Sequence, residues 1–197
     1  DVAEALKHLE RYDEAAQIFE EALTLARSLN APIYEADLLS HRADMAFGRG
    51  DHQQAQVDYT HSAEIYEAQG KREPLAGIYL KRARLALAVD ALDATQDYLT
   101  EALYLVHLEH QPHFVAEAIS LQAQVYAADS APEKAVEYAA AVINQAESQH
   151  LDILYTMLEE LQASLPDMVY ASALEMGQKH TLNAITAEIL TQHASTD

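Results

Sequence analysis

Small apolar residues recur every 40 positions along most of the chain. The first column with this spacing contains Ala3, Ala43, Ala83 and Ala123. Four more columns keep the same register, and they are Ala36/Ala76/Ala116, Ala15/Ala55/Thr95/Ala135, Phe19/Tyr59/Leu99/Ala139 and Ala22/Ser62/Ala102/Val142. Alanine is common here, so one column could arise by chance, but five columns in one register indicate an internal repeat.

Each repeating unit has the pattern of two helices joined by a short break. In the unit that begins near residue 36, ADLLSHRADMAF has helical spacing, GRGD interrupts it, and a second helical stretch ends at Gly70. We expect two helices of about 17 residues per unit, each about 25 Å long. Asp51 is expected to cap the second helix, and Ser130-Ala-Pro-Glu133 has the form of a capping box in the last unit.

Three short stretches carry a resemblance to a known family. They are Tyr12-Asp-Glu-Ala15, Ala15-x3-Phe19-x2-Ala22 and Gly50-Asp51…Ala55-x3-Tyr59. The pattern resembles tetratricopeptide (TPR) repeats over residues 1–150, although the unit exceeds the usual length of about 34 residues and lacks the family's Trp and Gly in its first helix. Lengthened repeats of this kind are similar to those at the C-terminal end of bacterial signalling ATPases and transcription activators.

The resemblance implies an all-α fold, a right-handed TPR-like solenoid of helical hairpins. Its units would begin near residues 36, 76 and 116, after a truncated first unit. Residues 151–197 would then form a half-repeat and capping helices, with a helix over Leu151–Ser164, a second helix that Gly177 breaks, and a last helix from about Thr181 to Thr191. This tail is similar to the closing segment of such regulators, and it also suits the plain cap that any solenoid requires.

The composition excludes several classes of protein. The 197 residues contain no Cys, which rules out a disulfide framework and a cysteine nucleophile. There are 12 Lys and Arg against 32 Asp and Glu, a net charge of −20, which argues against direct binding to nucleic acid or to an anionic membrane. The chain shows no signal peptide and no membrane span, so we expect a cytoplasmic protein, and the missing initiator Met suggests a piece of a longer chain.

Candidate chemistry is sparse. The densest histidine group is His107, His110 and His113, which could form a weak metal site but also suits a polar helix end. Adjacent carboxylates such as Glu20 and Glu21 diverge around a helix. The usual hydrolase, metalloprotease and phosphate-loop motifs are missing. We therefore expect no catalytic residue, no metal site and no cofactor, although an enzyme module upstream of this chain is possible.

A partner-binding groove is the main functional expectation. TPR solenoids line their concave face with the first helix of each pair, and carried onto this sequence that rule selects Asp37, Ser40, Asp44, Phe47, Leu80, Lys81, Arg84, Leu87, Glu117, Ser120 and Gln124. Lys81 and Arg84, three apart on one helical face, could accept an acidic peptide or a carboxylate. They could equally neutralise acidic neighbours within the chain, and the sequence leaves both readings open.

Three functions follow from this reading. The first is a protein- or peptide-binding scaffold that serves as the C-terminal sensor region of a larger bacterial signalling or transcription regulator. The second is a sensor that binds a small inducer molecule in the groove. The third is a module for self-association, giving a homodimer. The abundant tyrosines are expected to be mainly core residues, among them Tyr59, Tyr66, Tyr98, Tyr104 and Tyr138.

Overall fold

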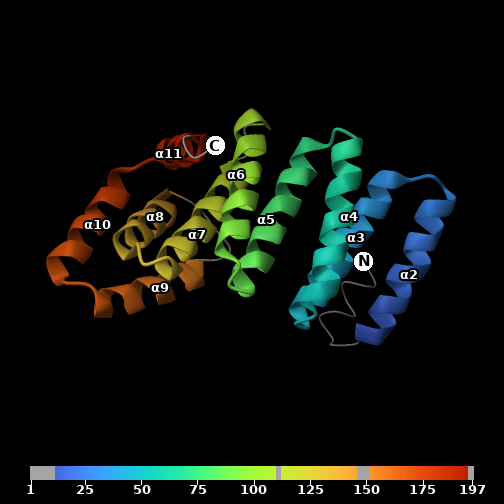
Figure 1. Cartoon of the computed structure of the whole chain (residues 1–197), viewed down its shortest axis with the longest axis horizontal. Helices are drawn as coiled ribbons and strands as arrows, with labels where there is room; N and C mark the ends of the chain where they lie inside the picture. The colour runs from blue at the N-terminus through green and yellow to red at the C-terminus, as the bar shows by residue number, and fades with distance from the viewer. Residues whose placement is uncertain (1–11, 110–111, 146–150, 195–197) are drawn as a thin grey trace. The chain divides into compact units, whose positions relative to one another are not determined.

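The computed structural model describes residues 12–109, 112–145 and 151–194, and within them every regular element is an α-helix (Figure 1). This confirms the prediction of an all-α fold. The chain divides into two compact units, Asp1–Leu85 and Ala86–Asp197, which are described separately below. The helices are α2 (Tyr12–Ser28), α3 (Pro32–Gly48), α4 (His52–Ala68), α5 (Arg72–Ala88), α6 (Leu92–Glu109), α7 (Pro112–Ala128), α8 (Pro132–Gln145), α9 (Leu151–Ser164), α10 (Asp167–Lys179) and α11 (Leu182–Ala194).

The helices keep a strict register along the chain. From α3 to α8, successive helices begin at equal intervals, at Pro32, His52, Arg72, Leu92, Pro112 and Pro132. Helices α3, α4, α5 and α7 each contain 17 residues, the length expected from the sequence. A pair of helices therefore spans one period of the sequence columns. Beyond α8 the equal spacing is lost, since α9, α10 and α11 begin at Leu151, Asp167 and Leu182.

One kind of turn ends five of the described helices, at intervals of 20 or 40 residues. Residues with positive φ are Asn30 (50°), Gly50 (79°), Gly70 (64°), Asp90 (60°) and Ser130 (58°). After each of these residues, the next backbone N–H donates to a carbonyl five positions earlier, as in Asp51 N–H to the Ala46 oxygen at 2.9 Å. This six-to-one bond is the mark of the Schellman turn, which satisfies carbonyl groups at the end of a helix.

Two capping predictions have different outcomes. Oδ1 of Asp51 accepts a hydrogen bond from the backbone N–H of Gln54 at 3.1 Å, so the predicted cap of α4 is confirmed. The capping box at Ser130 is wrong. An N-cap residue needs an extended backbone, whereas Ser130 has a φ of 58° and belongs to the turn that ends α7. Residue Ala131 is the one that immediately precedes α8.

The Ser130 turn gives a test of backbone strain. A left-handed φ costs a residue with a Cβ about 1 kcal/mol relative to glycine. Glycine also gives the unfolded chain more conformational freedom, which offsets part of this gain. Ser130→Gly is therefore expected to raise the free energy of unfolding by roughly 0.5–1 kcal/mol. The converse change, Gly50→Ala, meets no atom within 4 Å and should lower stability through backbone strain alone. Urea denaturation followed by circular dichroism measures both. A Ser130→Gly protein less stable than the wild type would contradict the expectation.

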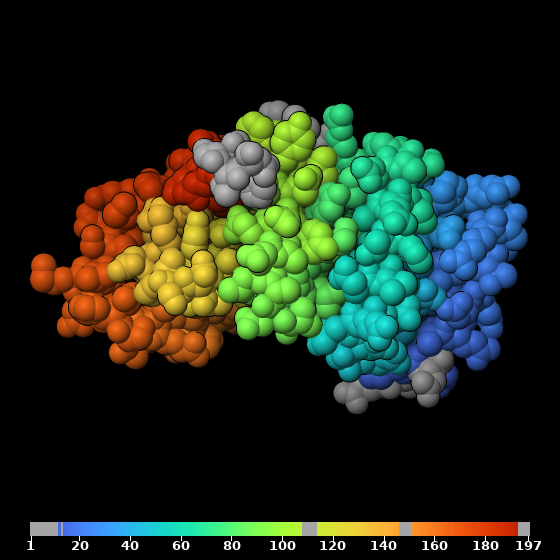
Figure 2. Space-filling view, in the orientation of Figure 1, coloured from blue at the N-terminus to red at the C-terminus, as the bar shows by residue number. Residues whose placement is uncertain are grey.

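The sequence columns form the core of each unit. In the first unit the column residues Ala15, Phe19, Ala36, Ala43, Ala55, Tyr59, Ser62, Ala76 and Ala83 are all buried. The hydroxyl of Ser62 donates to the backbone oxygen of Ala36 at 2.8 Å, which is how a polar residue is accommodated in an apolar column. The side chains of α2, α3 and α4 make continuous contact across this unit (Figure 2). Ala3 lies outside the described residues.

The second unit buries the corresponding positions and adds a cap. Its buried column residues are Thr95, Leu99, Ala102, Ala116, Ala123, Ala135, Ala139 and Val142. Helix α10 packs chiefly on α8, and α11 packs on α6, α7 and α8. The last helices thus cover the preceding ones within this unit.

A buried ion pair joins α3 to α4 in the first unit. The guanidinium of Arg42 donates to both carboxylate oxygens of Asp58, at 2.8 and 2.7 Å, and it also contacts Glu20 of α2. The side chain of Asp58 is fully buried, while that of Glu20 is exposed. Asp58 is therefore a buried carboxylate that is paired with the Arg42 guanidinium.

Gly177 lies inside α10 and does not end it. The predicted break is wrong, because α10 continues to Lys179, and α10 runs beside α8 (Figure 1). A Cβ atom at position 177 would lie 2.1 Å from the backbone oxygen of Glu137 and 2.8 Å from the Cβ of Ala140. The glycine is therefore what allows the two helices to approach so closely.

The tyrosine prediction is confirmed for Tyr59, Tyr66 and Tyr138, which are buried. Tyr98 is half-buried. Tyr104 is 55% exposed, so its assignment to the core is wrong. It precedes the buried Val106 by two positions, and residues two apart on a helix do not share a face.

Candidate functional site

The groove residues of the first unit come from α3 and α5, and they contact one another. Nζ of Lys81 donates to Oγ of Ser40 at 2.8 Å and to Oδ2 of Asp44 at 2.7 Å. The hydroxyl of Tyr59 donates to the other oxygen of Asp44 at 2.6 Å. Lys81 is therefore paired within the molecule, which is one of the two readings that the sequence left open.

The remaining groove residues of this unit vary in exposure. Ser40 and Leu80 are buried, so their side chains offer a partner little surface. Asp37, Phe47 and Arg84 are half-buried, and Asp37 accepts a hydrogen bond from the hydroxyl of Tyr66. The carboxylates of this face are thus largely committed to tyrosine hydroxyls and to Lys81.

Two of these tyrosines have strongly raised pKa values. Burial raises the pKa of Tyr59 well above its ordinary value, the Asp44 carboxylate raises it further, and the Arg84 guanidinium opposes the shift to a smaller extent. Burial also raises the pKa of Tyr66, together with its hydrogen bond to Asp37. In both cases the protonated phenol is the form that suits the folded protein.

This shift predicts a loss of stability in alkali. The pKa of Tyr59 in the folded protein lies above its value of about 10 in the unfolded chain. The contribution of this shift to the free energy of unfolding is therefore complete below pH 10, and it is lost as pH rises towards the pKa of the folded state. Between pH 9 and pH 11 the free energy of unfolding should fall by about 1.4 kcal/mol for each such tyrosine. In Tyr59→Phe the fall between the two pH values should be smaller by the amount due to one tyrosine. In the control Tyr155→Phe, which changes an exposed tyrosine, the fall should equal that of the wild type. An unchanged fall in Tyr59→Phe, measured by denaturation at both pH values, would refute this linkage.

The groove residues of the second unit include one that lines a pocket. Ser120 is buried, and its hydroxyl donates to the Ala116 oxygen of its own helix at 2.7 Å. Leu87, Glu117 and Gln124 are half-buried. The predicted groove residues come from both units. That the residues of the two units form one groove therefore stays a prediction.

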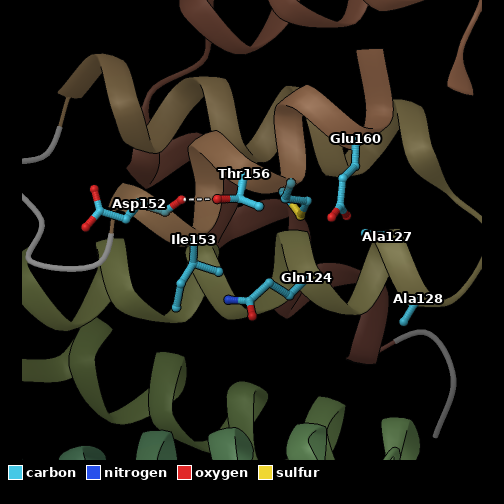
Figure 3. Close-up of a pocket in the computed structure, with 8 residues that line it drawn as sticks. Gln124, Ala127, Ala128, Asp152, Ile153, Thr156 and Glu160 are labelled. Atoms are coloured by element: carbon cyan, nitrogen blue, oxygen red, sulfur yellow. Dashed lines mark hydrogen bonds between the residues drawn. The ribbon is translucent and has the colours of Figure 1, made fainter. Parts of the chain in front are cut away.

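The pocket that includes Gln124 lies between α7 and α9 and has a volume of about 520 Å³. Helix α7 contributes Gln124, Ala127 and Ala128, and α9 contributes Asp152, Ile153, Thr156, Met157 and Glu160. Most of these positions are spaced three or four apart, which places them on one face of each helix. In Figure 3, Ile153 points towards Gln124, Glu160 lies near Ala127, and Asp152 stands at the opposite end of the row.

The pocket is apolar in its centre and acidic at its ends. Met157 is nearly buried and Ile153 is 50% exposed, whereas Asp152 and Glu160 are both exposed. Its lining residues include no Lys, Arg or His. Sequence reasoning identifies Gln124 but misses the residues of α9, because it assigns residues 151–197 to a half-repeat and capping helices and selects no groove residue from them. The spacing of Ile153, Met157 and Glu160 was the available signal.

A second pocket, of about 460 Å³, lies between α8 and α10. Its cation is Lys134, whose Nζ lies 2.7 Å from Oε1 of Glu188 and 3.6 Å from Oε2 of Glu137. Nδ1 of His180 lies 2.7 Å from the other oxygen of Glu137. The lysine of this pocket is therefore paired within the unit.

Neither metal nor membrane chemistry gains support within the described residues. They contain no group of three His, Asp or Glu side chains placed to hold a metal ion. His107 is exposed on α6, while His110 and the side chain of His113 lie outside the described part of the chain. Among the described helices, none has both the length and the apolar composition needed to cross a bilayer.

Compared with known proteins, the chain matches no family model, and no curated protein shows a significant sequence match.

Proposed function

We propose that this chain is a non-catalytic module of TPR-like helical hairpins that binds a protein partner through the pocket between α7 and α9. One observation carries the proposal. The pocket lies between α9 and α7, the first helix of the pair α7–α8, and its α7 side carries the groove residue Gln124. This is the face that the resemblance to TPR solenoids assigns to partner binding. The equal spacing of the helix starts and the repeated left-handed turns support the repeat assignment.

The character of the pocket agrees with a binding role. Ile153 exposes half of its side chain beside the sulfur-containing Met157, so an apolar contact is offered to an incoming side chain. Partner-binding energy concentrates where such apolar groups can be fully removed from water. By the resemblance to TPR repeats, the proposal also makes this module the C-terminal region of a larger bacterial regulator.

A small-molecule sensor is the second candidate function. The pocket volume of about 520 Å³ falls within the range of small-ligand sites, roughly 300–1,000 Å³. A ligand of this kind would raise the melting temperature, and the rise would grow with the logarithm of the ligand concentration once this exceeds the dissociation constant. Screening a metabolite set by thermal shift distinguishes this function, because peptides would then give no comparable rise.

The main test uses peptides selected against the folded protein. A random peptide library is panned on the immobilised wild type, and the enriched peptides are measured by fluorescence anisotropy. We expect Ile153→Gln to weaken their binding by about ten-fold, since it replaces the apolar contact with a polar group of similar size. The matched control is Tyr155→Gln, which alters a side chain of equal exposure on α9 outside the pocket. Equal effects of the two changes, at equal melting temperatures, would count against this surface.

A further inference from the structure

We infer that the α7–α9 pocket binds a basic partner segment, in which one large aliphatic side chain is flanked by Lys or Arg side chains. The inference rests on the proposed function and specifies the chemistry of the partner. It differs from the expectation based on Lys81 and Arg84, which favoured an acidic ligand. Three features of the second unit support it, namely the layout of the pocket, the distribution of charge, and the bonding of the basic side chains.

The layout of the pocket fixes the order of groups in the partner. Ile153 and Met157 form an apolar floor, and Ala127 leaves room above it because its side chain is a single methyl group. Asp152 and Glu160 lie eight positions apart on α9, which corresponds to about 12 Å along the helix axis. In Figure 3 they stand on either side of Ile153. A partner therefore needs an aliphatic group between two cations separated by roughly that distance.

This distance can be met by an ordinary peptide. In a helical partner it corresponds to about eight residues, or two turns, and in an extended partner it corresponds to about four residues. The amide Nε2 of Gln124 donates to the Ser120 oxygen at 3.2 Å, which leaves the amide oxygen and the second N–H of this side chain for a ligand. An acceptor beside two carboxylates favours a partner rich in N–H donors.

The distribution of charge favours a basic partner over an acidic one here. From residue 86 to the end, the sequence contains two Lys, no Arg, and 17 Asp and Glu, which gives a net charge of −15. Such a field attracts cationic segments over several ångströms and repels anionic ones. The charge within the pocket has the same sign as that of the whole unit, so local contacts and long-range attraction favour the same partner.

Both lysines of this unit are bonded elsewhere. Nζ of Lys134 lies 2.7 Å from Oε1 of Glu188, and Nζ of Lys179 lies 2.5 Å from Oε1 of Glu175. Neither lysine lines the α7–α9 pocket. Asp152 and Glu160 line the pocket, and a basic partner can neutralise them without displacing either lysine.

The test uses three synthetic peptides of one length, labelled with a fluorophore. The first places leucine between arginines, the second replaces the arginines with glutamates, and the third replaces them with glutamines. With the full chain at low ionic strength, we expect the arginine peptide to bind at least ten-fold more tightly than the glutamate peptide. Its affinity should fall as salt is added, since the pocket carboxylates are exposed to solvent.

Variants then locate the binding. Asp152→Asn combined with Glu160→Gln should weaken the arginine peptide about five-fold and reduce its dependence on salt. The control Glu159→Gln removes one exposed charge of α9 that does not line the pocket, and it should change affinity less than two-fold. Melting temperatures of all variants confirm that each is folded. If the double variant weakens binding no more than twice as much as Glu159→Gln, the net negative charge of the unit alone accounts for the affinity. The assignment of binding to the pocket is then overturned.

The remaining outcomes separate this inference from the proposed function. Equal or tighter binding of the glutamate peptide, still sensitive to Ile153→Gln, would overturn the basic partner and leave the binding surface intact. If library selection also enriches no peptide, the proposed function fails as well. Calorimetry with spermidine alone tests whether the pocket binds a small polyamine instead of a peptide. Binding of spermidine as tight as that of the arginine peptide would overturn a peptide as the occupant.

Discussion

Replacing Gly177 with alanine is expected to lower the free energy of unfolding by about 3 kcal/mol or more, at the upper end of the range for overpacked interiors. The added methyl would lie 2.1 Å from the backbone oxygen of Glu137, and neither α10 nor α8 can yield there by rotating a side chain. Thermal denaturation followed by circular dichroism measures the loss.

Gly48 supplies the matched control for this substitution. It is the last residue of α3, it is exposed, and a Cβ placed there meets nothing within 4 Å. Gly48→Ala is therefore expected to leave stability unchanged or to raise it by up to about 1 kcal/mol through better helix propensity. If Gly177→Ala behaved like Gly48→Ala, the close approach of α10 to α8 would be refuted.

Asp58→Ala should cost the first unit about 3–5 kcal/mol, because it leaves the part-buried Arg42 without its main partner. The loss exceeds that for an exposed pair, since both groups have already given up water. Glu20→Gln removes the exposed partner of the same guanidinium, and we expect a cost below about 1 kcal/mol. Urea denaturation of both variants provides the comparison.

A double substitution tests the reason for this effect. In Arg42→Met with Asp58→Leu, no buried charge is left unpaired, and such replacements are often neutral or stabilising. We expect this protein to be more stable than Asp58→Ala alone. A double variant as unstable as Asp58→Ala would show that packing at this site, rather than an unpaired charge, sets the cost.

The helices and their lengths could be predicted because the constraint is local and repeated. A small side chain is needed wherever two helices cross closely. The alanines that recur once in every repeat therefore indicate where the helices cross. Gly177 could not be interpreted in the same way. A glycine inside a helical pattern suits either a break or a close contact, and its neighbour Glu137 belongs to a helix far away in the sequence and to none of the columns.

The candidate site was only partly predictable for a similar reason. The partner of Lys81 could have been found from the register, since position 41 is equivalent to 81 and Asp44 lies one helical turn beyond it. The α9 side of the pocket could not, because the equal spacing of the helices ends at α8. Gln124 was identified through the family rule, whereas Ile153 and Glu160 depend on how α9 packs against α7.

The repeated left-handed turns have a consequence for how such a chain can evolve. Each described turn meets the following helix with the same hydrogen-bonded geometry, whether the residue is Gly50, Gly70, Asn30 or Asp90. A gene duplication or deletion that starts at one turn and stops two turns later would rejoin equivalent junctions. The protein can therefore gain or lose length in whole helix pairs. Mutations in a duplicated pair can then change what that pair recognises.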